Sequence, residues 1–157
     1  MINAVILDTN LLVLLVVGLT NINYIAAHKR LSSFTIDDYH LLTATLSSAE
    51  TLVVTPNTLS EASNLLRYIA EPAKSEIHAV FRTFILNYEE RYLKSGDASS
   101  RQEFVRLGLT DSALLEVSKN DVLLLSVDLD LCIAAEIAQY KFINFNHLRD
   151  AHFSQTS

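Results

Sequence analysis

Short runs of apolar residues alternate with helical patterns along the chain. Four runs predict strands, at positions 4–7, 51–54, 122–126 and 141–144. The first run is apolar throughout, which is typical of a strand that is buried on both faces of a sheet. Because strands alternate with helices, the pattern predicts an α/β fold with a parallel sheet.

Several helices expected between these strands have recognisable ends. One follows Asn10, whose side chain can cap it, and another spans residues 36–48. Thr55 caps a third helix, which has a proline at its first position. The next proline, Pro72, breaks that third helix.

The helix after Pro72 has the clearest amphipathic pattern in the chain. One apolar stripe repeats at three- and four-residue spacing, at Ile77, Val80, Phe81, Phe84, Ile85 and Tyr88. We expect this helix and the one before it to form an antiparallel hairpin. The stripe is broader than a small sheet needs, so we predict a homodimer through the helix pair 57–93. The alternative is that the stripe packs inside the chain.

The second half of the chain gives shorter signals. Residues 96–100 are rich in glycine and serine and predict a loop. Gly108 is expected to end a short helix, and Thr110 to cap the next one. A further helix is predicted over residues 130–139.

Composition bounds the domain organisation. The 157 residues, of which 50% are hydrophobic, indicate a single domain over 1–150 and a polar tail, 151–157, that we expect to fray. The longest apolar run, 11–19, falls short of the roughly 20 residues of a membrane span, so no membrane is expected. Cys132 is the only cysteine, which excludes an internal disulfide. We predict a cytoplasmic protein.

Five acidic residues fall where the predicted elements meet. Asp8 ends the first strand, Glu61 lies in the helix after the second, and Asp111 begins a helix before the third. Asp128 follows the third strand, and Asp130 comes two residues later. Ligands of open parallel sheets bind beyond the carboxyl ends of the strands. We therefore expect these carboxylates to gather at one edge of the sheet.

Clustered carboxylates repel one another, and a divalent cation removes that repulsion. Oxygen ligands of this kind suit Mg²⁺ or Mn²⁺, which can activate water and stabilise the leaving oxygen of a phosphodiester. Taken singly, each acid also has a structural explanation, as a turn residue, a helix cap or a solvated helix residue. The interpretation as a metal site depends on the set.

Four segments resemble, in order, the motifs of the PIN-domain family. They are VILDTN at 5–10, TPNTLSE at 55–61, LTDSA at 109–113 and SVDLDL at 126–131. In the last segment Ser126 stands where the family usually has threonine. The resemblance covers residues 2–145.

The resemblance implies a three-layer α/β/α sandwich and an Mg²⁺- or Mn²⁺-dependent nuclease, most often an endoribonuclease. Many small bacterial members are toxins of toxin–antitoxin pairs, so the expected partners are RNA, with DNA left open, and an antitoxin protein. The expected catalytic residues, which also bind metal, are Asp8, Glu61, Asp111 and Asp128. Asp130 is expected as a further metal ligand, and whether it or Asp128 is the fourth ligand is left open.

Three polar residues of the motifs are expected to support these ligands. The Thr9 hydroxyl would orient Asp8 or a water, Ser126 would hydrogen-bond a ligand carboxylate, and Asn10 would cap the helix. Turn and cap roles are the alternative. No zinc-type spacing of histidines is present.

The charge of the chain is unusual for a nucleic-acid enzyme. Eighteen acids against twelve bases give a net charge of −6, whereas nucleic-acid binders are usually basic. Bound metal would offset part of this charge. The bases that could contact phosphates, if they are not merely solvated, are Arg82, Arg91, Lys94, Arg101 and Arg106.

Two other functions are considered. One is a non-catalytic PIN-like module that binds other proteins, which a metal titration would distinguish. The other is a phosphotransfer enzyme with Asp8 as nucleophile. Such enzymes need a second aspartate two positions later, where this chain has Asn10.

Overall fold

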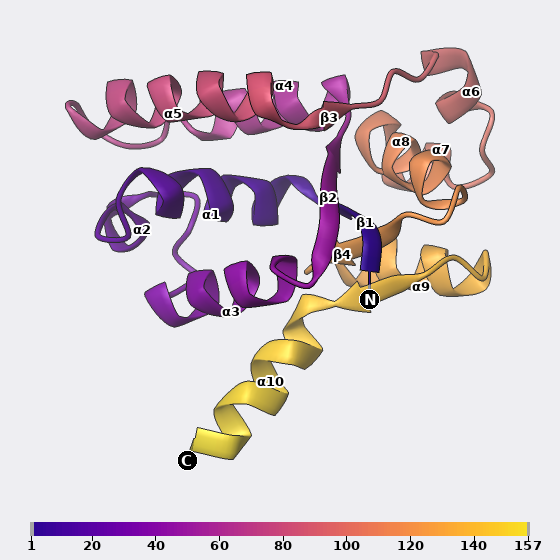
Figure 1. Cartoon of the computed structure of the whole chain (residues 1–157). Helices are drawn as coiled ribbons and strands as arrows, with labels where there is room; N and C mark the ends of the chain where they lie inside the picture. The colour runs from indigo at the N-terminus through magenta and orange to yellow at the C-terminus, as the bar shows by residue number, and fades with distance from the viewer. Residues whose placement is uncertain (1, 157) are drawn as a thin grey trace.

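Five parallel strands form the centre of the molecule (Figure 1). The computed structural model of the chain describes residues 2–156. The strand order is β3-β2-β1-β4-β5. The strands are β1 (Ile2–Leu7), β2 (Ala49–Val54), β3 (Glu89–Glu90), β4 (Leu123–Ser126) and β5 (Phe142–Asn144). The expected α/β fold with a parallel sheet is confirmed, and β3 is a strand that the apolar pattern did not predict.

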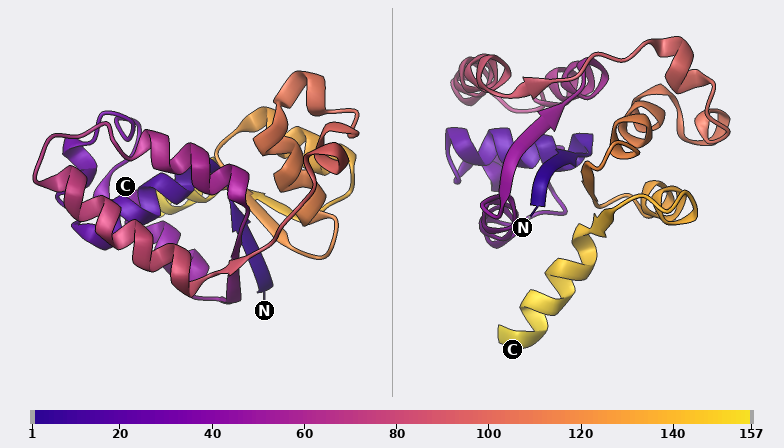
Figure 2. Two further views of the ribbon diagram at one scale, coloured as in Figure 1. Left: turned by 90° about the horizontal axis from the view of Figure 1, so that it is seen from above. Right: turned by 45° about the vertical axis from the view of Figure 1, so that its right-hand side comes forward.

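Helices cover both faces of this sheet, which gives a three-layer α/β/α sandwich (Figure 2). On one face, α1 (Thr9–Thr20) lies against β1 and β4. Its residues 11–18 are all buried, because α3, α4 and α5 pack around the side that faces away from the sheet. A helix enclosed in this way can be apolar around its whole circumference. The apolar run that follows Asp8 is thus a central element of the core.

Four further helices complete this layer: α2 (Tyr24–Ala27), α3 (Ile36–Leu46), α4 (Pro56–Leu65) and α5 (Ala73–Asn87). Helix α4 leads away from the end of β2, and α5 returns to β3, as the expected hairpin requires (Figure 2). Thr55 caps α4 by accepting a hydrogen bond from Thr58 N. The α5 stripe packs inside the chain, with Ile77, Phe81 and Phe84 buried in the core.

The opposite face carries α8 (Leu109–Ser118) and α9 (Leu129–Ile137), whose small and branched apolar residues pack on β1 and β4. Two short helices, α6 (Ser95–Ser99) and α7 (Phe104–Leu107), precede them. The expected loop at 96–100 is therefore wrong for most of its length. Gly108 lies at the junction of α7 and α8 with a φ of 87°, and it takes the N-cap position that was expected for Thr110.

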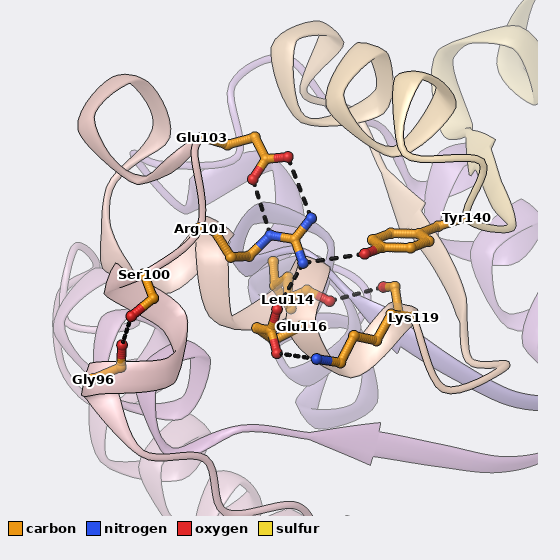
Figure 3. A network of polar contacts seen from close by, with 9 residues as sticks. Gly96, Ser100, Arg101, Glu103, Leu114, Glu116, Lys119 and Tyr140 are labelled. Atoms are coloured by element: carbon orange, nitrogen blue, oxygen red, sulfur yellow. Dashed lines mark hydrogen bonds and ion pairs between the residues drawn. The ribbon is translucent and has the colours of Figure 1, made fainter.

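Arg101 holds this second layer together through a polar network (Figure 3). Its guanidinium forms ion pairs with Glu103, at 2.9 Å, and with Glu116, at 2.7 Å. It also donates to the Tyr140 hydroxyl at 3.2 Å. The side chains of Arg101, Glu103 and Glu116 are largely buried. This arginine therefore links the segment before α7 to α8 and to the residues that follow α9. Its guanidinium is used in these internal contacts.

The chain continues as α10 (Phe145–Thr156), which extends away from the sandwich (Figure 1). Phe145 is fully buried, whereas residues 151–155 are exposed. The domain boundary expected at residue 150 falls inside this helix. Residue 157, at the end of the expected tail, lies outside the described residues. Within residues 2–156, none of the helices combines the length and the apolar character that crossing a bilayer requires.

We predict that Gly18→Ala destabilises the fold by about 1–3 kcal/mol through overpacking. A Cβ atom at Gly18 would lie 2.2 Å from Cδ2 of Tyr39, whose ring is buried between α1 and α3. Gly96→Ala is the matched control, because nothing lies within 4 Å of its added carbon. That control should be neutral or gain up to about 1 kcal/mol. Urea unfolding of both variants measures the difference, and equal stabilities would contradict this packing.

Candidate functional site

The candidate site lies where the carboxyl ends of β1 and β4 meet. These strands are parallel neighbours, with Leu7 opposite Leu125. The Asp8 backbone N–H continues the ladder by donating to the carbonyl of Leu125 at 3.1 Å. Asp8 and Asp128 therefore emerge at the same edge, as the topology of a parallel sheet requires.

Asp8 is buried, and both of its carboxylate oxygens accept hydrogen bonds. One oxygen accepts from Leu11 N at 2.9 Å, so Asp8, rather than Asn10, caps α1. The other accepts from Ser126 Oγ at 2.5 Å and from Val127 N at 2.8 Å. Burial raises the pKa of Asp8, and these three hydrogen bonds oppose the rise. The arrangement fixes the carboxylate between α1 and the end of β4.

Glu61 joins this edge from α4. Its two oxygens accept hydrogen bonds from Thr9 Oγ1 at 3.1 Å and from Thr110 Oγ1 at 2.8 Å. The first threonine starts α1 and the second belongs to the first turn of α8, so Glu61 bridges three helices. Thr9 was expected to orient Asp8 or a water, and it donates to Glu61 instead. Thr110 was expected to cap a helix, and the sequence pattern did not identify it as a partner of Glu61.

Asp111 is half-buried at the start of α8, and no described residue donates a hydrogen bond to its carboxylate. Burial raises the pKa of Asp111 to about 7, with further contributions from the charges of Asp128, Asp8 and Glu61. Four carboxylates from four elements thus lie close enough to affect one another. Asp111 is the member whose oxygens are left free.

Asp128 has a structural role as well. It caps α9 by accepting a hydrogen bond from Leu131 N at 3.1 Å, and its own N–H donates to Ser126 Oγ at 2.9 Å. Ser126 therefore connects Asp8 to Asp128. Asp130 is exposed in the first turn of α9 and is not among the charges that raise the pKa of Asp111. The structure brings Asp128 to the cluster and leaves Asp130 outside it.

The donor set is made of oxygen atoms, which suits Mg²⁺ or Mn²⁺. Among residues 2–156, no three His, Cys, Asp or Glu side chains stand close enough together to enclose an ion by themselves. Mg²⁺ does not require such a cage, since it keeps several waters and is held through one or two carboxylates and the substrate phosphates. The free oxygens of Asp111, beside Asp8 and Asp128, fit that mode of binding.

Two of the bases expected to contact phosphates are engaged elsewhere. Arg101 is committed to Glu103 and Glu116, and Arg91 pairs with Glu89 at 3.0 Å. Two other bases, Lys29 and Arg30, come from a segment without a clear sequence signal and line a pocket together with Asn10 and Val127, which flank the carboxylate edge.

Comparison of the chain with models of known protein families found no match, and comparison with curated protein sequences found none either.

We predict that Asp111→Asn stabilises the metal-free protein more at pH 8 than at pH 5. The folded-state pKa of about 7 exceeds the ordinary value of 3.8, so the folded chain retains a proton that the unfolded chain has lost. The resulting loss of stability grows with pH and is complete above about pH 7. The neutral amide avoids it. The extra gain at pH 8 should be about 1–2 kcal/mol, after allowance for solvent screening at this half-buried position.

Chemical unfolding with a chelator present, at the two pH values, measures this effect. Asp130→Asn is the control, since it removes an exposed aspartate outside the cluster and should show no such pH dependence. A gain for Asp111→Asn that is the same at both pH values would disprove the crowding of these carboxylates.

Proposed function

We propose that this protein is a metal-dependent nuclease that hydrolyses phosphodiester bonds, and that its substrate is RNA. One observation carries the proposal. The half-buried carboxylate of Asp111 accepts no hydrogen bond from any of residues 2–156, and it lies among three other carboxylates at the C-terminal edge of a parallel sheet. An arrangement of this kind is unfavourable by itself and becomes favourable when a divalent cation is present.

The residues divide into ion-binding and supporting groups. Asp111, Asp8, Asp128 and Glu61 would together hold Mg²⁺ or Mn²⁺, directly or through bound waters. When bound, such an ion supplies an activated water and neutralises the developing charge on the phosphate. Hydrogen bonds from supporting groups keep ligand carboxylates oriented. Ser126 and Val127 N do this for Asp8, and the two threonines, Thr9 and Thr110, do it for Glu61.

The choice of RNA and of partners follows from the resemblance of four segments to PIN-domain motifs. The same resemblance suggests a cytoplasmic toxin held by an antitoxin protein. A homodimer through helices 57–93 also stays a prediction. The apolar stripe proposed for this dimer is largely used inside the chain, which leaves four exposed large apolar side chains in that region, Tyr68, Leu86, Tyr88 and Tyr92.

The alternative is a non-catalytic module that binds other proteins. It is favoured by the fact that Asp8 and Glu61 already have hydrogen-bond donors on both oxygens. In that case the polar contacts of the edge would serve only to join α1, α4 and α8. Metal binding and cleavage distinguish the two functions.

We expect Mg²⁺ or Mn²⁺ to raise the melting temperature at pH 8. An ion that binds only the folded state at about 100 times its Kd adds about 2.7 kcal/mol, or roughly 5–10 °C for a chain of this size. The shift should largely vanish in Asp111→Asn and persist in Asp130→Asn. An unchanged melting temperature at millimolar Mn²⁺ would argue for the protein-binding module.

Cleavage tests the function directly. The wild-type protein should cut members of a mixed RNA and DNA panel with Mn²⁺ and be inactive with chelator. Asp8→Asn, Glu61→Gln and Asp111→Asn should each reduce the rate by more than about 100-fold, because each removes a charged ligand of the ion.

Thr110→Val provides a graded comparison, since it removes a hydrogen bond to Glu61 and keeps the shape of the side chain. Loss of such a supporting contact typically reduces activity by about 10–100-fold. Full activity of Asp8→Asn or Asp111→Asn protein would refute the proposed nuclease.

A further inference from the structure

A polar pocket of about 530 Å³ opens beside the carboxylate edge. Three bases, Lys29, Arg30 and Arg149, line it together with the amides of Asn10 and Asn146, and no carboxylate is among the lining residues. The chain as a whole carries a net charge of −6, so a concave surface with only basic and neutral side chains contrasts with the rest of the molecule.

The pocket and the carboxylate edge share a wall. Val127 lines the pocket, and its backbone N–H donates to Asp8 at 2.8 Å, while its carbonyl accepts from Asn146 Nδ2 at 3.1 Å. Asn10 forms another part of the wall and lies in the first turn of α1, two residues after Asp8. A ligand that fills the pocket therefore reaches the residues that flank Asp8.

Arg149 gives the pocket its shape rather than its charge. Its guanidinium pairs with both oxygens of the fully buried Asp38, at 3.0 and 3.1 Å, and donates to the carbonyl of Ser33 at 2.7 Å. It also lies over the ring of Phe34, 5.2 Å from the centroid. The charge of Arg149 is thus balanced by Asp38, and these contacts fix the segment 32–34 against α10.

Lys29 and Arg30 give the pocket its positive charge. Both are exposed, and no carboxylate of residues 2–156 lies within 4 Å of either side chain. The Arg30 guanidinium lies over the Tyr68 ring, 5.4 Å from its centroid, and the Lys29 backbone N–H donates to the carbonyl of Tyr68. Tyr68, in the segment that follows α4, thus holds the Lys29 backbone and the Arg30 guanidinium, and both bases remain available to an anion.

We propose that this pocket binds the sugar–phosphate backbone of a single-stranded nucleic acid next to the bond that is cut, which rests on the proposed nuclease function. Carboxylates at the sheet edge repel a polyanion, and two unpaired bases in the adjoining pocket offset that repulsion. Arg, Lys, Ser and Asn side chains are the groups that commonly contact phosphates and sugars. A cavity of about 530 Å³ has the size of a small-ligand site, so it accommodates a short stretch of one strand and not the full width of a duplex.

The test is binding of a fluorescent single-stranded RNA, measured by anisotropy with a chelator present so that no cleavage occurs. Lys29→Gln combined with Arg30→Gln should raise Kd by about tenfold at low salt. Loss of two phosphate contacts should also lower the slope of log K against log salt by roughly 1.4. Lys119→Gln combined with Lys141→Gln removes the same charge from exposed positions outside the pocket, and should change Kd by less than about twofold.

The outcomes separate this pocket from the nuclease proposal. Equal changes of Kd in the two double variants, or tighter binding of duplex RNA, would overturn the proposed role of the pocket. If the double variant of Lys29 and Arg30 cleaves RNA with Mn²⁺ as fast as the wild type, the nuclease function is supported and the role of the pocket in it is refuted. If the wild type binds RNA through these two bases but cleaves nothing, the proposed role of the pocket is supported and the proposed nuclease function is refuted. Absence of binding by every protein overturns the pocket.

Discussion

The carboxylate of Asp8 is buried, and burial of a charge is tolerated only where hydrogen bonds replace the lost water. Its three donors come from the first turn of α1 and from the end of β4. One side chain therefore starts the central helix and ties two neighbouring strands together at their carboxyl ends. Glu61 and Asp111 come to the same edge because α4 and α8 pack against α1 and β4, which Asp8 connects. The crowding of the four carboxylates is a consequence of this junction.

Elements whose sequence pattern reflects burial could be predicted. The continuous apolar runs gave β1, β2, β4 and β5 to within about two residues of their ends, and the order of strands and helices predicted the parallel sheet. Because the carboxyl ends of parallel strands meet at one edge of a sheet, the sequence predicted that Asp8 and Asp128 lie together. Strand β3 could not be found, since Glu89–Glu90 is short and polar and is a strand only because it pairs with β2. Residues 96–99 belong to α6 although their glycine and serine suggest a loop, because Ala98 is buried there.

The rest of the site depends on contacts between distant parts of the chain. Thr110 and Glu61 are 49 residues apart, and no local pattern predicts their hydrogen bond. The pocket joins Lys29 to Arg149 of α10, a helix that the sequence pattern did not predict. The capping of α1 was assigned to Asn10 because a helix start was placed two residues too late. A correct start at Thr9 would have shown that Asp8, already a candidate ligand, is also the cap of α1.

The contacts of α10 also set the order in which the molecule can be completed during synthesis. Chain growth proceeds from the N-terminus, and domains fold as their segments emerge from the ribosome. Asn146 and Arg149 supply one side of the basic pocket, and Asp38 remains an uncompensated buried acid until Arg149 arrives. All four carboxylates of the edge are present once the chain reaches Asp128, and the bases Lys29 and Arg30 emerge earlier still. A nascent chain therefore carries every charge of the edge and of the pocket about twenty residues before Asn146 and Arg149 give the pocket its shape.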